Sequence, residues 1–249
     1  MANMSNQFTV DLCLFDLDGT IVSTTRAVEM TWKKLCAEHD VDPEELFRFS
    51  HGTRTGEVFA KFFPDIDNTD NRAAVAFELS IADDLSLISL IPGAQELLLK
   101  LDKNTTDGSA VGERKWAIVT SGSPELTLSW FDNVLKEVGR PPVFISGADV
   151  AKGKPDPEGY YTGRNLLCQK LGLDASHART VVFEDAPVGI MAGKAIGAIT
   201  VGIAGTYDKD LLYSAGADYV VSDLNQVKVI ENTKGGPIKL EIVERLGKI

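Results

Sequence analysis

With 249 residues, 44% of them hydrophobic and 24% charged, the chain has the composition of a soluble globular protein with a substantial core. Its 36 acidic and 25 basic residues give a net charge of −11, which argues against nucleic acid or an anionic membrane as a partner. No apolar run approaches a membrane span and segment 1–9 does not resemble a secretory signal, so a cytoplasmic location is expected. The scattered Cys13, Cys36 and Cys168 are expected to be buried, reduced thiols.

The first predicted strand, Leu12–Phe15, ends at Asp16, Asp18 and Gly19. Four consecutive apolar residues suit a parallel strand that is covered on both faces. Residues two apart in an extended chain point the same way, so both carboxylates can address one volume beyond the strand's carboxyl end. Such close carboxylates repel unless a cation or a proton separates them, which indicates a divalent metal and a titrating proton. A solvated turn remains the alternative for this stretch alone.

The segment after this strand has helical patterns and no convincing strand. The predicted helices cover residues 27–39, 57–63 and 71–85, with another that begins at Asp42 and Pro43. We therefore predict a helical cap domain, residues 23–89, inserted into a discontinuous core domain of residues 1–22 and 90–249.

From residue 94 onward, strand and helix patterns alternate, as they do in a doubly wound parallel sheet. The predicted strands are 115–119, 143–145, 180–183, 199–203 and 219–221, and the predicted helices are 94–101, one that begins at Ser123, one that ends at Leu171, and 188–196. The tail 227–243 alternates around Gly235 and Gly236 and predicts an edge hairpin. The predicted fold class is thus α/β, a doubly wound, Rossmann-like core with a small α-helical cap.

Four polar stretches follow strand-like runs along the chain. They are 16–20, 120–122, 152–154 and Glu184-Asp185. Because the carboxyl ends of parallel strands meet at one edge of a sheet, one site would hold several acids, a hydroxyl and a lysine. Each stretch alone has an ordinary explanation, such as a turn, a solvated lysine or a helix cap. Their joint placement favours a site.

In this order the motifs resemble those of the haloacid dehalogenase superfamily of aspartate-nucleophile phosphatases, and the resemblance covers nearly the whole chain. A helical cap inserted after the first motif is one of the arrangements of that family. Longer segments are similar to the branch that hydrolyses 2-deoxyglucose 6-phosphate, with glycerol-phosphate phosphatases as near relatives. These segments are 15–21, 50–55, 153–158 and 182–189.

The resemblance implies that Asp16 attacks phosphorus to form an aspartyl phosphate. Asp18 would protonate the leaving alcohol and later accept a proton from water. It also implies that Mg²⁺ is held by Asp16, Asp185 and the backbone carbonyl of Asp18, while Glu184 holds a metal-bound water. The expected partner is a small phosphomonoester substrate, and the expected state is a monomer.

Further roles follow from the same resemblance. Thr120, together with Ser121 and Gly122, would bind the transferring phosphoryl group, and Lys154 would neutralise that group and the nucleophile.

Substrate choice is expected to reside in the cap, whose helices can close over the group attached to phosphate. His51 and Arg54 are the candidates there, with Thr24 after the first strand as a third. A turn hydrogen bond for His51 and a structural ion pair for Arg54 are equally compatible with the sequence.

The sequence argues against three other kinds of site and leaves two alternatives open. The three cysteines lack the arginine of a cysteine phosphatase loop, Pro155 after Lys154 excludes a Walker-type nucleotide site, and the histidines lack zinc-ligand spacing. A sugar phosphomutase of the same superfamily would share all four motifs and stays an alternative. A non-catalytic phosphate-ester sensor is a second alternative, although it would not need both Asp16 and Asp18.

Overall fold

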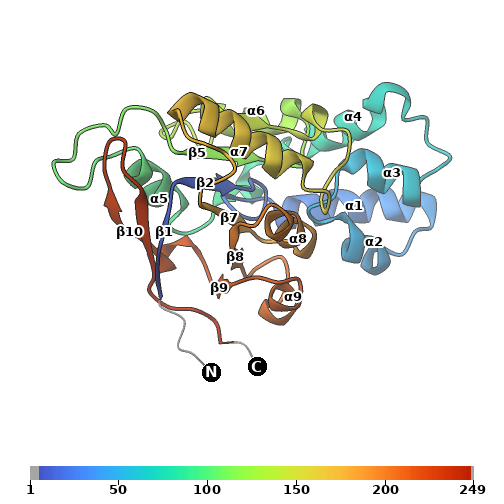
Figure 1. The fold of residues 1–249 in the computed structure, drawn as a ribbon. Coiled ribbons are helices and arrows are strands. Elements are labelled where there is room, and N and C mark those ends of the chain that lie inside the picture. Colours follow the sequence, from blue (N-terminus) through green and yellow to red (C-terminus); the bar gives the residue numbers. More distant parts are fainter. Residues whose placement is uncertain (1–5, 248–249) are drawn as a thin grey trace.

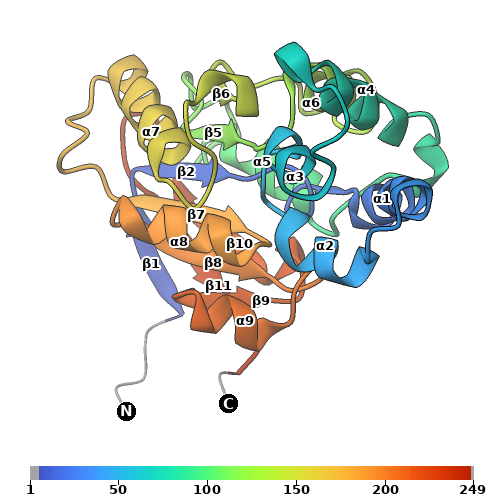
Figure 2. The ribbon, with the colours of Figure 1, turned by 90° about the vertical axis from the view of Figure 1, so that its right-hand side faces the viewer.

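The computed structural model of the protein describes residues 6–247 and is built on a six-stranded parallel sheet of order β6-β5-β2-β7-β8-β9. Figure 2 shows these strands in that order from top to bottom. Their bounds are β2 Leu12–Phe15, β5 Trp116–Val119, β6 Phe144–Ile145, β7 Thr180–Glu184, β8 Ile199–Ile203 and β9 Tyr219–Val221. Every neighbouring pair is parallel, so the predicted parallel sheet is confirmed.

The alternation of side chains along β2 explains why the sheet is covered on both faces. Leu12 and Leu14 pack into a cluster with residues of α7 (Glu158–Leu171) and α8 (Pro187–Ala195). The intervening Cys13 and Phe15 pack on the opposite face with residues of α5 (Ala94–Leu101) and α6 (Pro124–Asp132). All of β2 is therefore buried, as its unbroken apolar run predicts.

A short helix beside the last strands is not apparent from the sequence. The six residues of α9 (Lys209–Ser214) pack against β8 and β9, with Leu212 and Tyr213 buried. Its pattern is too short to separate a helix from a loop by periodicity.

The predicted terminal hairpin forms, but not at the edge of the parallel sheet. Strands β10 (Val227–Asn232) and β11 (Ile238–Ile242) join β1 (Gln7–Val10) in a separate three-stranded antiparallel sheet. Its apolar side packs into the same cluster as α5 and α6. The buried Lys115 fixes the hairpin by donating from Nζ to Asn232 Oδ1 and to the Gly236 carbonyl, both at 2.8 Å. Strand β1 is not among the predicted strands, since its sequence Gln-Phe-Thr-Val alternates between polar and apolar residues over only four positions.

The segment between β2 and the rest of the sheet forms four helices that pack around their own aromatic core, beyond one end of the sheet (Figure 1). We call these helices the cap; they are α1 Thr25–His39, α2 Pro43–Ser50, α3 Thr55–Phe62 and α4 Arg72–Ile81. The Trp32 ring lies 3.8 Å from the Phe77 ring and stacks on Phe63 at 5.8 Å, centroid to centroid. Asp42 caps α2 through the amide of Glu44, as the sequence predicts.

The two segments that connect cap and sheet pair with each other. Strand β3 (Val22–Ser23) lies antiparallel to β4 (Ser89–Leu90), so the chain enters and leaves the cap through one short ribbon. Four 3₁₀ turns complete the secondary structure of the described residues, at Thr69–Asn71, Leu85–Leu87, Gly147–Asp149 and Leu224–Gln226. The three cysteines are buried and free, as predicted. None of the helices in the described part of the chain has the length and apolar character that crossing a membrane requires.

Candidate active site

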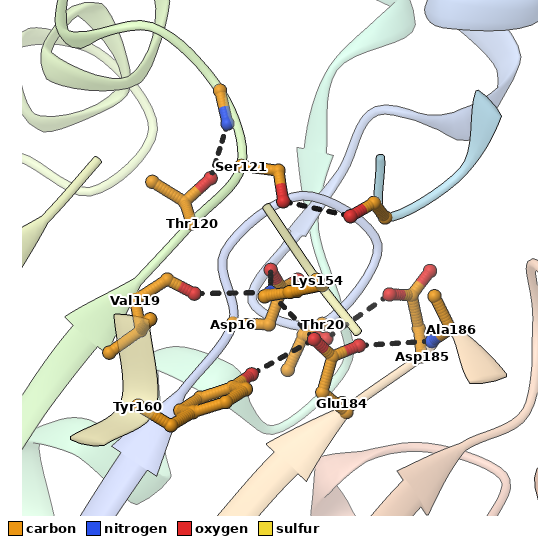
Figure 3. A network of polar contacts seen from close by, with 12 residues as sticks. Asp16, Thr20, Val119, Thr120, Ser121, Lys154, Tyr160, Glu184, Asp185 and Ala186 are labelled. Carbon is orange, nitrogen blue, oxygen red and sulfur yellow. Dashed lines mark hydrogen bonds and ion pairs between the residues drawn. The ribbon is translucent and has the colours of Figure 1, made fainter. Parts of the chain in front are cut away.

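Three carboxylates meet where the central strands end. Asp16 follows β2, Glu184 ends the neighbouring strand β7, and Asp185 comes next. One oxygen from each lies within 4.8 Å of the others, and all three residues are buried (Figure 3). The parallel pairing of β2 with β7 thus brings together acids that are far apart in the sequence.

Lys154 is the cation at this cluster. Its Nζ lies 2.6 Å from Asp16 Oδ1 and 2.6 Å from Glu184 Oε1, and it also donates to the Val119 carbonyl at 3.2 Å (Figure 3). Burial alone would lower the pKa of Lys154, but the two carboxylates outweigh burial and raise that pKa above its usual value. Lys154 therefore remains charged and orients the Asp16 carboxylate.

Glu184 is held from several sides. Its Oε1 accepts from Lys154 and from the Tyr160 hydroxyl at 2.9 Å, and its Oε2 accepts from the Ala186 amide at 3.0 Å. Gly189 on α8 makes room for this carboxylate, because a Cβ there would lie 1.7 Å from Glu184 Oε1. These contacts occupy most of the acceptor capacity of Glu184. Its expected role through a water stays a prediction, and Tyr160 has no local sequence signal for its contact.

The cluster has too little positive charge for its carboxylates. Asp16 Oδ2 is buried without a hydrogen-bond partner among residues 6–247. Burial raises the pKa of Asp16 to about 7 even though Lys154 opposes the shift, and burial beside Asp16 also raises the pKa of Asp185. An orphaned carboxylate oxygen in an all-oxygen donor set, with three acids facing one lysine, fits a hard divalent cation such as Mg²⁺.

The turn after β2 is shaped around Asp185. Gly19 has φ +90°, which favours glycine, and a Cβ at this position would lie 2.0 Å from Asp185 Oδ2. The Thr20 hydroxyl reaches Asp185 Oδ1 at 3.5 Å. Glycine is therefore required here by conformation and by space.

Asp18 is oriented by a residue that the sequence analysis missed. Its Oδ1 accepts from the indole Nε1 of Trp130 on α6 at 3.0 Å, and Thr24 also hydrogen-bonds its side chain. Burial raises the pKa of Asp18 to about 6, while the Trp130 hydrogen bond lowers it. A carboxyl that titrates near neutral pH suits an acid that must both give and take a proton.

The loop after β5 contains the predicted phosphate-binding residues. The Gly122 amide donates to Thr120 Oγ1 at 3.1 Å, which leaves the Thr120 hydroxyl proton able to point elsewhere. Ser121 Oγ donates to the Gly52 carbonyl at 2.8 Å and so ties this loop to the cap. Ser123 caps α6, as its Ser-Pro-Glu sequence predicts.

A cavity of about 90 Å³ lies between this edge of the sheet and the cap. Of the predicted site residues, those that line it are Asp16, Asp18, Thr24, His51, Thr120, Ser121, Gly122 and Asp185. The cap adds residues without a local sequence signal, namely Trp32, Phe77 and the buried Glu78.

The structure does not bring Arg54 into this cavity. Its guanidinium donates from Nε to Glu57 at 2.8 Å and to the backbone carbonyls of Val150 and Ala151 at 3.0 and 3.2 Å. His51 lies at the cavity with Nε2 3.4 Å from Glu29, and burial lowers its pKa. Arg54 therefore connects the cap to the core and forms an ion pair with Glu57, which is the structural role that the sequence left open. His51 lines the cavity.

Comparison with known proteins agrees with this geometry. A family model described as haloacid dehalogenase-like hydrolase matches residues 10–197. The protein is similar to 2-deoxyglucose-6-phosphate phosphatase 2 of Saccharomyces cerevisiae, with 62% identity over 92% of this chain and 94% of that protein. Glycerol-1-phosphate phosphohydrolase 2 of the same yeast is 37% identical over 88% of this chain and 85% of its own length.

A solved structure supports the fold independently. A haloacid dehalogenase hydrolase of family IA from Entamoeba histolytica has a TM-score of 0.68 and 24% identity, covering 88% of this chain and 95% of that one. The match of the family model over most of the chain, on a fold that gathers the four motifs at one sheet edge, establishes that the chain belongs to the haloacid dehalogenase-like hydrolase family.

Proposed function

We propose that the protein is a Mg²⁺-dependent phosphatase of small sugar phosphates that works through an aspartyl phosphate, with 2-deoxyglucose 6-phosphate as the leading substrate. The observation that carries the proposal is the state of the Asp16 carboxylate. Lys154 holds one of its oxygens, and the other oxygen has no hydrogen-bond partner in the described chain. Asp16 and Asp18 line the same cavity. The substrate class rests on the activity for which the 62% identical yeast relative is named.

In the first half of the proposed reaction, an Asp16 oxygen forms a bond to phosphorus and the ester bond between phosphorus and the sugar oxygen breaks. Asp18, protonated at this stage, gives its proton to the departing sugar oxygen, so that a neutral alcohol leaves. The Trp130 hydrogen bond holds the Asp18 carboxyl in one orientation during the transfer.

In the second half, water attacks phosphorus and the bond between Asp16 and phosphorus breaks, which frees inorganic phosphate. Asp18, now ionised, takes the proton from the attacking water and returns to its starting state. Lys154 and the hydroxyl of Thr120, together with the Ser121 amide in the 120–122 loop, stabilise the negative charge of the transferring phosphoryl group.

We assign the ligands of Mg²⁺ to Asp16, Asp185 and the Asp18 carbonyl, with Glu184 behind them. When bound, the ion would neutralise the acidic cluster and the phosphate oxygens, which lets an anionic nucleophile approach an anionic ester. The excess of buried carboxylates over cations in the described site supports this assignment.

The cavity walls suit a sugar phosphate with an unsubstituted carbon. Hydroxyl-bearing residues such as Thr24, Thr53 and Thr55 lie beside apolar ones such as Trp32 and Phe77. A sugar hydroxyl that is buried against an apolar wall loses its hydrogen bonds to water, whereas a methylene group has no such bonds to lose.

We also propose that the protein is a monomer. A cytoplasmic location is proposed because buried free cysteines suit a reducing compartment.

The test is phosphate release from a panel of 2-deoxyglucose 6-phosphate, glucose 6-phosphate, fructose 1-phosphate, sorbitol 6-phosphate, glycerol phosphate and β-glucose 1-phosphate, with Mg²⁺ and with chelator. Mg²⁺-dependent release led by a sugar phosphate supports the proposal. Isomerisation of β-glucose 1-phosphate without phosphate release would replace it with the mutase. Binding without turnover of any member would replace it with the sensor.

A further inference from the structure

Ser50 is a buried residue of the cavity with an unused hydroxyl. It is the last residue of α2, is 7% exposed, and lines the same cavity as Asp16 and Asp18. Its Oγ is buried and finds no hydrogen-bond partner among residues 6–247. A buried hydroxyl without a partner lowers the stability of the folded protein by roughly 1–3 kcal/mol. A serine at this position therefore calls for an explanation other than stability.

Other helical hydroxyls of this protein do not behave in this way. Thr31 and Thr127 each donate to the carbonyl four residues earlier, at 2.9 and 2.7 Å, and Ser80 donates to the Phe77 carbonyl at 2.6 Å. Such bonds to the preceding turn are the usual solution for serine and threonine in helices. Ser50 makes no bond of this kind, and its hydroxyl is available to a ligand.

The segment that follows Ser50 is fixed against the catalytic edge of the sheet. His51 contacts Glu29 and packs edge-on to the Tyr207 ring, 6.0 Å between centroids. The Gly52 carbonyl accepts from Ser121 in the phosphate-binding loop, and a Cβ on Gly52 would lie 2.7 Å from Ala186 Cβ. The cap therefore holds Ser50 at a set position beside the reacting groups.

The charges around the cavity limit which kind of substrate group can bind to Ser50. Among the described residues that line the cavity there is no lysine or arginine, and burial lowers the pKa of the one histidine, His51. The buried Glu78 adds a further carboxylate to the cap wall. A second phosphate would find no counter-ion at this end, whereas a neutral hydroxyl could bond to Ser50.

We propose that Ser50 is a specificity-determining residue whose hydroxyl hydrogen-bonds a hydroxyl on the carbon skeleton of the substrate. This inference rests on the proposed function. It narrows the substrate class to monophosphates that carry a hydroxylated carbon chain, and it excludes sugar bisphosphates as good substrates.

The test compares Ser50→Ala with the wild type on 2-deoxyglucose 6-phosphate and on phenyl phosphate, which has no hydroxyl. We expect kcat/KM for the sugar phosphate to fall between about 5-fold and 100-fold, the usual range for one lost hydrogen bond to substrate, with kcat/KM for phenyl phosphate unchanged. Ser80→Ala is the matched control, because its exposed hydroxyl lies on α4 and bonds only to its own helix. Equal losses on both substrates, or no loss on either, would overturn the inference.

A thermal melt without ligand separates a binding role from a structural one. Removing an unpartnered buried hydroxyl should leave Tm unchanged or raise it, whereas removing a structural hydroxyl lowers it. A clear fall in Tm for Ser50→Ala would therefore also contradict the inference. If the wild type releases phosphate from no sugar phosphate, the proposed function itself fails, which is a different result from a variant that does not discriminate.

Discussion

The carboxylate of Glu78, on cap helix α4, accepts a hydrogen bond from the backbone amide of Ser123, at the start of core helix α6, at 2.8 Å. Its other oxygen accepts from Thr55 Oγ1, so this carboxylate joins two cap helices to the core. Glu78 is 4% exposed and forms no ion pair within residues 6–247. The partial positive charge at the N-terminus of α6 attracts the carboxyl group that accepts from it.

We predict that Glu78→Ala destabilises the protein by about 1–3 kcal/mol in urea unfolding, because the Ser123 amide loses its acceptor in a buried place. Hydrogen exchange at the Ser123 amide should accelerate. Glu78→Gln should lose much less, since its oxygen can accept from Ser123 while its amide donates to Thr55. Equal stability of Glu78→Ala and the wild type would show that the cap does not depend on this contact.

Replacing the two aspartates that we assign to catalysis should separate their proposed roles. We predict that Asp16→Asn lowers kcat on the order of 10⁴-fold or more, since an amide does not replace a carboxylate nucleophile. Asp18→Asn should lower it by about 10²–10⁴-fold, the usual range for general acid–base catalysis. Phosphate release under saturating substrate measures both. Asp83→Asn, an exposed carboxylate of the cap segment, should keep full activity; full activity of Asp16→Asn would refute the mechanism.

The sequence predicts the parallel sheet and the acidic residues that meet at its edge because their signals are local. One unbroken apolar run leads to Asp16 and another leads to Glu184. Each run predicts a strand and also shows which polar residues lie at its end. The glycine of the first motif is also a local signal, since Gly19 is required by its own backbone conformation.

Residues that act across the fold are not predictable in this way. Trp130 orients Asp18 from 112 positions away, and Glu78 reaches Ser123 from cap helix α4. The sequence left a specificity role and a structural ion pair open for Arg54 for the same reason, since its carbonyl partners at Val150 and Ala151 are about a hundred positions distant. Strand β1 pairs with β11 near the other end of the chain, and the alternation of polar and apolar residues over its four positions is a weak signal by itself.

The metal assignment can be tested by stability rather than activity. We predict that Mg²⁺ raises the Tm of the wild type, because a ligand that binds only the folded state stabilises it by mass action. Replacing a residue that only contacts a metal's direct ligands typically weakens metal binding roughly 10–100-fold. Asp185→Asn removes an assigned direct ligand and should weaken Mg²⁺ binding by more than this. The rise in Tm should therefore require a higher Mg²⁺ concentration than in the wild type. Asp18→Asn is the control, because it keeps the backbone carbonyl assigned to the ion. An Asp185→Asn response identical to the wild type would remove this residue from the metal site.

The pairing of Asp11 with Arg179 predicts a pH dependence of stability away from the active site. The guanidinium lies 2.8 Å from Asp11 Oδ1 and the Arg179 amide donates to Asp11 Oδ2 at 2.9 Å. The side-chain hydrogen bond from Arg179 lowers the pKa of Asp11 below its usual range. Because the folded pKa is below the unfolded one, the pair stabilises the protein above the unfolded pKa of about 3.9, and this stability is lost as the pH falls through the folded pKa.

For this reason Asp11→Asn should lower the free energy of unfolding at pH 7 by about 0.2–1 kcal/mol, the range for a pair whose arginine is half exposed to water. The difference from the wild type should shrink as the pH falls below about 4, because the wild-type carboxyl is then protonated as well. Urea unfolding at several pH values measures it, with Asp83→Asn as the matched control. A difference that stays constant from pH 7 to pH 3 would show that the carboxylate charge contributes nothing, and that the effect of the substitution is one of shape alone.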